Sequence, residues 1–266
     1  MDISFVGGGV MAEALLKGLL SADLSNPAEL TVSDPLGERR LYLESEYGIN
    51  TVESNSSILD GNGIVILAVK PQILPYVLSD LSGKISDARS VASIVAGATS
   101  MTIREGLSHN AVVRIMPNTP AQIGEGMSVW YSTGDVAESD KSFIGKMLRT
   151  LGDEVYVEDE KFVDMATALS ASGPAYVFLF IESLIDSGVY LGMSRDMARR
   201  LVLQTVLGSA ELVKQSGKHP AELKDMVTSP GGTTIEALVS MEDERFRASV
   251  IKGVRAAYDR SLELGG

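Results

Sequence analysis

Three small residues near the N-terminus of this 266-residue sequence follow a spacing that suits a phosphate group. Gly7, Gly9 and Ala12 form the pattern G-x-G-x-x-A between an apolar run at residues 3–6 and a helical pattern at 11–20. Such a pattern allows a tight turn, a close approach of a pyrophosphate to the backbone and close packing of the helix on the strand. The helix start adds free N–H groups and the positive end of the helix dipole. We therefore predict a dinucleotide site; in the alternative interpretation, the glycines serve only as a turn.

The residues that would choose between the two nicotinamide dinucleotides follow a second apolar run at 30–33. Asp34 could accept hydrogen bonds from the ribose hydroxyls of NAD, and its charge would repel the 2′-phosphate of NADP. Ser33 with Arg39 or Arg40 could instead hold that phosphate through charge-assisted hydrogen bonds. In a third interpretation, both arginines are only solvated on a helix face. The pattern favours NADP(H) slightly and leaves NAD(H) open.

A second glycine-rich segment, Ser-Pro-Gly-Gly-Thr-Thr, lies late in the chain at residues 229–234. Gly231 and Gly232 bare the backbone before a helix that we expect to start near Thr233, with Glu236 three residues on as in a capping box. The N–H donors of a helix start suit a small carboxylate. We therefore predict that this loop binds the substrate. The alternative is a plain turn between helices, which would not need two glycines beside two hydroxyls.

The first half of the chain alternates strands with helices. We expect strands at residues 3–6, 30–33, 64–69, 90–95, 111–116, 127–131 and 155–157, and helices at 11–20 and 139–151. This order predicts an α/β fold with a parallel, right-handed, doubly wound sheet. Such sheets bind ligands at the carboxyl ends of their strands, so we expect segments 68–72 and 95–97 to lie over the cofactor, with Lys70 as a functional side chain.

From about residue 160 the strands stop, and helices are expected at 174–187, 194–217 and 220–227 and from 233 and 245 onward. Ser172 is expected to cap the first of them. The change divides the chain into a nucleotide-binding domain at 1–159 and a helical domain at 160–266. Residues 175–185 are apolar nearly all round, so this helix must be covered on more than one side. It is either the core helix of a monomer or part of an obligate homodimer, and we favour the homodimer.

The composition excludes several classes of function. A net charge of −12 opposes binding to nucleic acid. The sequence has no cysteine and only two histidines, which excludes disulfides and multi-histidine metal centres, and we predict no metal site. The N-terminus lacks the basic segment of a secretion signal, and the longest apolar run is shorter than the roughly 20 residues that cross a bilayer. We therefore expect a soluble, cytoplasmic protein with no membrane partner.

A composite of residues, most of it in the helical half, resembles the pyrroline-5-carboxylate reductase family, and the resemblance covers nearly the whole chain. The residues that carry it are 172–176, Glu182, Asp186, Gly188, Val189, Gly192, Met193, Ala198, Gln204, Gly208, Pro220, Leu223 and 229–234, with 68–71 and 116–120 in the first half. The resemblance implies a Rossmann-type doubly wound domain followed by an all-α dimerisation domain. It also implies active sites at the dimer interface and dimers that assemble further, often into decamers.

The resemblance implies roles for single residues as well. Positions that match cofactor contacts are Gly7, Gly8, Gly9, Val10, Met11, Asn55, Ala68, Val69, Lys70, Pro71, Ile94, Val95 and Ala96. Positions that match the surroundings of the substrate are Glu160, Thr233 and Thr234, and the loop residues Ser229, Gly231 and Gly232 complete the predicted substrate site. Thr234 is the predicted catalytic residue, because its hydroxyl is expected to meet the substrate nitrogen.

The implied reaction is hydride transfer from NAD(P)H to the C=N carbon of 1-pyrroline-5-carboxylate, which yields L-proline in the last step of proline biosynthesis. An alternative is an enzyme of the same plan with another substrate, either a related cyclic-imine reductase or a β-hydroxyacid reductase. β-Hydroxyacid enzymes usually place a lysine on the first interdomain helix, and residues 174–187 contain none. A non-catalytic dinucleotide-sensing protein of the same fold is a further alternative, although it would not need the loop at 229–234.

Overall fold

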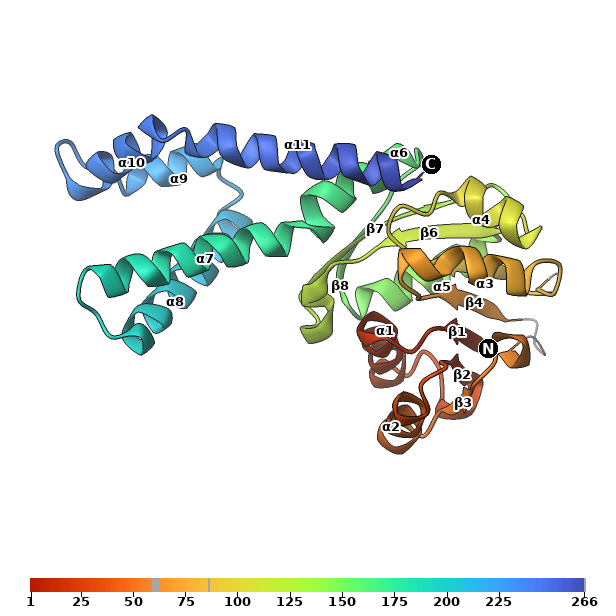
Figure 1. Cartoon of the computed structure of the whole chain (residues 1–266). Helices are drawn as coiled ribbons and strands as arrows, with labels where there is room; N and C mark the ends of the chain where they lie inside the picture. The colour runs from red at the N-terminus through yellow and green to blue at the C-terminus, as the bar shows by residue number, and fades with distance from the viewer. Residues whose placement is uncertain (59–62, 86, 266) are drawn as a thin grey trace. The chain divides into compact units, whose positions relative to one another are not determined.

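The computed structural model describes residues 1–58, 63–85 and 87–265, which form two compact units (Figure 1). The first unit comprises Met1–Ser172 together with Ala257–Gly266, and the second comprises Gly173–Ala256. The C-terminal end of the chain therefore packs with the N-terminal unit. The predicted domain boundary between residues 159 and 160 stays a prediction, because the two units are defined by packing contacts alone.

The first unit is built on one sheet of eight strands in the order β3-β2-β1-β4-β5-β6-β7-β8. The strands are β1 (Ile3–Val6), β2 (Leu30–Ser33), β3 (Asn50–Val52), β4 (Ile64–Leu67), β5 (Ser90–Ser93), β6 (Val112–Met116), β7 (Gly126–Ser132) and β8 (Gly152–Tyr156). The neighbours from β3 to β6 are parallel, which confirms the predicted doubly wound arrangement. The three-residue edge strand β3 was not predicted from the sequence.

The expectation that every strand is parallel is wrong at one place, since β7 runs antiparallel to β6. The connection from Met116 to Gly126 holds only the short helical turn η4 (Thr119–Ile123). A parallel pair requires a crossover of roughly a dozen residues or more, usually with a helix, and this connection is too short for one. The connection from β7 to β8 does carry a helix, α5, and that pair is parallel.

Helices cover both faces of this sheet because alternate strand residues point to opposite sides. Phe5 and Ile66 belong to one core cluster, and Val6 and Leu67 belong to the other. Helices α1 (Val10–Ser21), α2 (Gly37–Tyr47) and α5 (Glu138–Arg149) contribute to the first cluster, and α3 (Leu74–Leu81) and α4 (Ser100–Leu107) to the second. The strands near the centre are consequently apolar along their whole length, as their sequences predicted.

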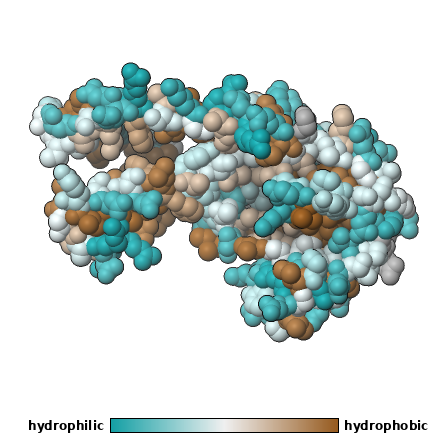
Figure 2. All heavy atoms as spheres, viewed as in Figure 1, coloured by the Kyte–Doolittle hydropathy of each residue, from teal (hydrophilic) through white to brown (hydrophobic). Residues whose placement is uncertain are grey.

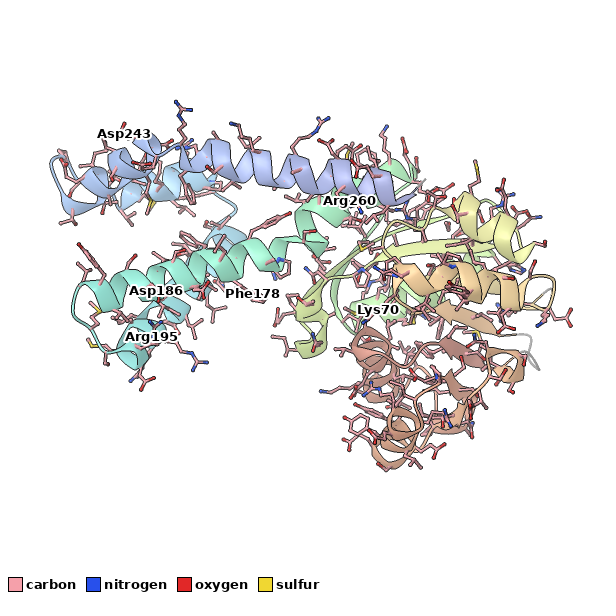
Figure 3. The ribbon with its side chains drawn as sticks, in the orientation of Figure 1. Lys70, Phe178, Asp186, Arg195, Asp243 and Arg260 are labelled. Carbon is pink, nitrogen blue, oxygen red and sulfur yellow. The ribbon has the colours of Figure 1, made fainter. Side chains whose placement is uncertain are left out.

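The second unit is helical. It contains α7 (Gly173–Tyr190), α8 (Arg195–Ser216), α9 (Pro220–Met226), α10 (Thr233–Asp243) and the first part of α11 (Phe246–Gly265). Helix α8 packs closely on α7, because a Cβ atom added at Gly188 would lie 2.7 Å from the Cβ of Ala198. Asp186 and Arg195 point toward each other at the turn between these helices and form an ion pair of 2.8 Å (Figure 3).

This helical unit buries little of its apolar surface. The side chains of Phe178 and Leu179 on α7 are 61% and 64% exposed, and none of the residues of α7 is buried. Figure 2 shows hydrophobic side chains gathered on the surface of the helical unit. An exposed apolar surface of this extent marks an interaction site in a folded protein. The sequence-based interpretation of α7 as the core helix of a monomer is therefore wrong.

Helix α7 does not begin at a capping serine. Residues Lys161–Tyr190 form one helix of 30 residues that includes α6 (Lys161–Ala166) and a π-helical turn, η5 (Thr167–Ala171). Ser172 has helical backbone angles, and its N–H donates to the carbonyl of Thr167 over 2.9 Å, so the predicted cap at Ser172 is wrong. In the described part of the chain, this is the one helix whose length and composition would allow it to cross a membrane. Helices that form a core or an interface meet the same criterion.

Candidate active site

The turn after β1 has the geometry that the glycine pattern predicts. Gly7 has a φ of 97°, which side chains rarely allow, and a Cβ atom at this position would lie 2.8 Å from the carbonyl oxygen of Ala68. Its N–H donates to the carbonyl of Ser33 over 2.9 Å. The turn therefore lies against the ends of both neighbouring strands, β2 and β4. Only glycine fits there without moving the backbone.

Gly9, two residues later, lies beside open space and not against a neighbouring strand. It is the N-cap of α1, with an extended backbone (φ −68°, ψ −178°) and no side-chain cap. A Cβ atom at Gly9 would meet no atom within 4 Å, so the space beside this backbone is open. The first N–H groups of α1 have no side-chain acceptor here and lie at the positive end of the helix dipole. An open, uncapped helix start of this kind fits the pyrophosphate of a dinucleotide.

A cluster of polar side chains holds this turn from α1 and α2. The Nε of Arg39 donates to the carbonyl of Gly8 over 2.5 Å, and its terminal nitrogen pairs with Glu13 over 2.5 Å. The hydroxyls of Tyr42 and Tyr47 donate to the same carboxylate over 2.9 and 2.8 Å. These contacts fix the glycine turn to the two helices that flank it.

The Glu13 carboxyl is held in its ionised form by this cluster. Burial by itself would raise its pKa, but the hydrogen bonds from Arg39 and the two tyrosines outweigh burial and lower the pKa below the ordinary 4.5. Burial and the Glu13 carboxylate together raise the pKa of the Tyr47 hydroxyl, which therefore stays protonated and donates. Arg39 is thus committed to the protein itself, and its guanidinium supports the backbone of the turn.

The carboxylate of Asp34, just after β2, accepts hydrogen bonds from the backbone on both sides. One oxygen of Asp34 accepts from the N–H of Gly8 over 3.0 Å, and the other accepts from the N–H of Leu36 over 2.9 Å. Arg40 donates to the carbonyl oxygen of Asp34 over 2.7 Å. The carboxylate stabilises the two turns around it, and its charge is partly compensated by these donors.

Ser33 and Asn55 lie together, at the ends of β2 and β3, but they face the protein. The Ser33 hydroxyl is 1% exposed and donates to Asn55 over 2.8 Å, and it also contacts the carbonyl oxygen of Phe5. Asn55 in turn donates to Asp80 on α3 over 3.3 Å. The Ser33 hydroxyl is thus buried and paired within the protein, and its contact with the 2′-phosphate stays a prediction.

The carboxyl ends of β4 and β5 lie side by side, as predicted for the other half of the cofactor. Leu67 leads into Ala68, whose carbonyl faces Gly7, and the N–H of Ile94 donates to the carbonyl of Leu67 over 3.0 Å. Val95 is 2% exposed and packs into the core, so only its backbone is available to a ligand. Lys70 is exposed (Figure 3). Val69, Pro71 and Ala96 occupy the same two strand ends.

Glu160 lies in a network of polar groups within the first unit. It accepts from the Arg114 guanidinium over 3.0 Å, and from the N–H and hydroxyl of Ser100 over 2.7 and 2.5 Å. Asp164 holds the same guanidinium over 2.6 Å. The Arg114 side chain is 1% exposed, so two carboxylates neutralise a fully buried cation. The Glu160 carboxylate therefore already has several partners.

The loop before α10 presents a second open helix start. Gly231 has a φ of 63°, and Gly232 is the N-cap of α10 with an extended backbone (φ −87°, ψ 175°) and no side-chain cap. A Cβ atom at Gly232 would lie 2.2 Å from the Oγ of Ser229, so a larger residue would require the Ser229 side chain to move. The predicted capping box of Thr233 and Glu236 is wrong, because Thr233 is already inside the helix. Thr233 is exposed and Thr234 is half-buried.

The first unit has two sizeable cavities on its helical surface. A cavity of about 430 Å³ opens beside the start of α1 and is lined by Val10, Glu13 and Tyr42, among others. A larger hollow of about 830 Å³ lies at the far ends of α1 and α5. Two of its cations, Lys146 and Arg149, lie in the last turn of α5, where positive side chains complement the helix dipole. The smaller cavity lies against α1 and α2, and of the predicted cofactor contacts only Val10 lines it.

Comparison with known proteins decides the family. Residues 160–264 match the family described as Pyrroline-5-carboxylate reductase dimerisation, and residues 2–97 match the family described as NADP oxidoreductase coenzyme F420-dependent. The pyrroline-5-carboxylate reductase of Synechocystis sp. is 43% identical over 265 residues, covering 100% of this chain and 98% of that protein. The chain belongs to the pyrroline-5-carboxylate reductase family.

Two further relatives agree. The pyrroline-5-carboxylate reductase of Escherichia coli is 37% identical over 263 residues, which cover 98% of this chain and 97% of that protein. The crystal structure of Plasmodium falciparum pyrroline carboxylate reductase with NADP bound has a TM-score of 0.91 and 36% identity, and covers 100% of this chain and 98% of that one. The predicted family, fold class and enzyme class are confirmed, and the chain is an oxidoreductase of the pyrroline-5-carboxylate reductase family. Its helical part is a dimerisation domain, which accounts for the exposed apolar side chains of α7.

Two polar clusters of the first unit were not predicted from the sequence. The ion pairs of Arg114 with Glu160 and Asp164 were not predicted, although an arginine inside an apolar strand signals a buried partner. The Glu13 cluster was also missed, because residues on α1 and α2 meet only after the sheet has brought the two helices together. The roles of single residues in binding cofactor and substrate stay predictions.

Proposed function

We propose that this chain reduces 1-pyrroline-5-carboxylate to L-proline with NADPH, and that its two open helix starts bind the two anions of the reaction. The supporting observation is a shared geometry: Gly9 and Gly232 are N-caps with extended backbones and no side-chain cap. The start of α1 would receive the pyrophosphate, and the start of α10 would receive the carboxylate of the imino acid. Glycine leaves the space beside the start of α1 open, and at position 232 it avoids a close contact with the Ser229 side chain.

NADPH is the proposed cofactor, in agreement with the NADP in the Plasmodium falciparum structure. Both oxygens of Asp34 accept backbone N–H groups, which compensate part of its negative charge, and the guanidinium of Arg40 lies against its carbonyl oxygen. Arg40 is the proposed ligand of the 2′-phosphate. Its guanidinium donates to the Asp34 carbonyl oxygen. Its second contact is an ion pair with Glu53, whose nitrogen–oxygen distance of 3.4 Å is long. A phosphate would replace that contact with a charge-assisted hydrogen bond.

The remaining cofactor contacts are proposed at the turn and at the ends of β4 and β5. Backbone groups of residues 7–11, 68–71 and 94–96 would line the dinucleotide, and Asn55 would act through its hydrogen bond to Ser33. When bound, reduced nicotinamide supplies the hydride. The protein residues orient the cofactor and exclude water from the reacting atoms.

Substrate chemistry is proposed at the loop of residues 229–234. The backbone around Gly231, Gly232 and Thr233 binds the carboxylate, and the Thr234 hydroxyl donates to or accepts from the ring nitrogen. A protonated imine accepts hydride better than a neutral one, so a hydroxyl that holds the N–H in place favours the reactive form. We assign Glu160 a supporting role near the substrate, since its carboxylate is largely committed to Arg114 and Ser100.

The biological form is proposed to be a cytoplasmic homodimer, with dimers that can assemble into decamers. The dimer would cover the exposed side chains of α7, such as Phe178. Glu182 and Asp186 lie on the same helix, which suits a protein interface better than a lipid bilayer. A surface with a net charge of −12 opposes nucleic acid as a partner.

One assay separates the proposed function from its alternatives. The purified 266-residue chain is tested in three separate reactions. Two contain NADPH with either 1-pyrroline-5-carboxylate or a six-membered cyclic imino acid. The third contains NADP with a β-hydroxyacid. We expect turnover with the five-membered imine and much slower turnover with the others. A β-hydroxyacid as the best substrate would contradict the proposal, and cofactor binding without any turnover would indicate a dinucleotide sensor. The absence of lysine from α7 argues against the first of these outcomes.

A further inference from the structure

The last turn of α11 packs within the first unit, against the loop that follows β5 (Figure 1). Gly97 in this loop has a φ of 77°, and a Cβ atom on it would lie 2.8 Å from the Cβ of Leu264 and 3.2 Å from its carbonyl oxygen. In the opposite direction, a Cβ atom on Gly265 would lie 3.1 Å from the Gly97 oxygen. Backbone meets backbone at this contact, so the loop cannot shift toward α11 unless the turn moves too.

A polar contact anchors the same turn of α11. Ser261 is 3% exposed, and its hydroxyl lies 3.4 Å from one oxygen of Asp164 on α6. That oxygen also accepts from the buried Arg114 guanidinium over 2.6 Å. The turn is therefore attached to a cation that lies inside the sheet, and a buried cation with two carboxylates has little freedom to move.

The loop after β5 is held at its other end by the same cation. Arg114 donates to Glu160 over 3.0 Å, and Glu160 accepts from the N–H of Ser100, the first residue of α4, over 2.7 Å. The chain of contacts thus runs from Gly97 through the α11 turn, Asp164 and Arg114 to Glu160 and back to the loop. It is a closed ring, and residues 97–100 lie between its two attachment points.

We propose that the last turn of α11 is a positioning element for the cofactor, because it fixes the loop that begins with the cofactor-binding backbone of residues 94–96. This inference rests on the proposed function, which places NADPH against that backbone. Without the turn, the loop would sample several positions, and only a fraction of the molecules would be ready to bind. The dissociation constant rises by the inverse of that fraction, so a loop in place about a tenth of the time weakens NADPH binding about tenfold.

Three variants of the full chain test this role. Ser261→Asp places a second carboxylate beside Asp164, and a chain ended after Arg260 removes the turn entirely. Arg260→Ala is the matched control, since Arg260 is on the same turn with a 65% exposed side chain and pairs with Glu263 over 2.7 Å (Figure 3). The measurements are the Kd of NADPH by fluorescence without imino acid, the KM of the imino acid, the melting temperature and the mass by light scattering.

We expect both altered turns to raise the Kd of NADPH about tenfold, with the KM of the imino acid and the mass close to those of the unaltered chain when measured well below the melting temperature. The melting temperature itself should fall, because the turn is packed and Ser261 is buried. The control should behave like the unaltered chain. An unchanged Kd in both altered proteins would overturn the inference, and so would an equal loss of affinity for NADPH and for the imino acid. If the shortened chain does not fold, Ser261→Asp decides alone. Failure of the unaltered chain to bind NADPH would instead refute the proposed function.

Discussion

Two glycines of one turn should respond in opposite ways to the same added methyl group. In Gly7→Ala, the methyl group would lie 2.8 Å from the Ala68 oxygen, on a backbone with a φ of 97°. The unfavourable backbone costs about 1–3 kcal/mol. The overlap costs about 1–3 kcal/mol more, because a backbone carbonyl cannot turn aside as a flexible side chain can. The free energy of unfolding should therefore fall by about 2–6 kcal/mol.

In Gly9→Ala, the backbone angles suit alanine and the methyl group meets no atom within 4 Å. The expected loss of stability is about 1 kcal/mol or less, from the poorer N-cap. Cofactor binding is a different matter, because the methyl group occupies the space where we place the pyrophosphate. Losing one charge-assisted hydrogen bond costs about 1.5–3 kcal/mol, which weakens NADPH binding about 10- to 100-fold.

Urea unfolding measures the stability of both variants, and NADPH fluorescence measures their affinity. We predict that the Gly9→Ala protein is nearly as stable as the unaltered chain but binds NADPH weakly, and that the Gly7→Ala protein is much less stable. A Gly9→Ala protein that binds NADPH as tightly as the unaltered chain would refute the placement of the pyrophosphate. Equal losses of stability in the two variants would refute the steric distinction between the two glycines.

Four further outcomes are expected. Arg40→Ala should raise the KM for NADPH about tenfold and leave the KM for NADH unchanged in steady-state assays, and equal effects on both would remove Arg40 from the 2′-phosphate. Thr234→Ala should lower kcat/KM about tenfold, with Thr234→Ser partly restoring it, and wild-type kcat/KM in the alanine variant would exclude a role at the nitrogen. Glu13→Gln should destabilise the fold at neutral pH. Because the pKa of Glu13 is lowered in the folded protein, its stabilising effect exists above its ordinary pKa of 4.5 and disappears as the pH falls through the folded value, so urea unfolding should show the variants converging in acid. Phe178→Asp should abolish the dimer in light scattering, and an unchanged mass would place the interface elsewhere.

Local patterns predicted the parts of this fold that depend on neighbouring residues. Apolar runs bounded by turns located seven of the eight strands, and the missing one, β3, has only the three residues Asn50–Val52 at the sheet edge. The reversed direction of β7 depends on the length of the connection after Met116, which carries no apolar periodicity. Similarly, Ser172 resembles a helix cap in sequence, but the residues before it already form α6 and the π-helical turn, so no helix starts there.

In the candidate site, too, locally determined features were predictable and features that depend on the fold were not. The glycine pattern predicted the turn at Gly7 and the open helix start at Gly9, because those requirements are local. The hydrogen bonds of Asp34 were not predictable, since the backbone N–H groups of Gly8 and Leu36 reach its carboxylate only in the folded turn. The buried partners of Arg114 lie some 46 and 50 residues away in the sequence, so only the fold brings them together.

The most direct measurement follows the hydride itself. NADPH that carries deuterium at both hydrogen positions of the nicotinamide C4 is incubated with the purified chain and 1-pyrroline-5-carboxylate, and the product is examined by mass spectrometry and NMR. We predict L-proline with deuterium on the ring carbon that was double-bonded to nitrogen. Proline without that label, or labelled NADPH that remains unconsumed beside the imine, would contradict the assignment of this chain as an imine reductase.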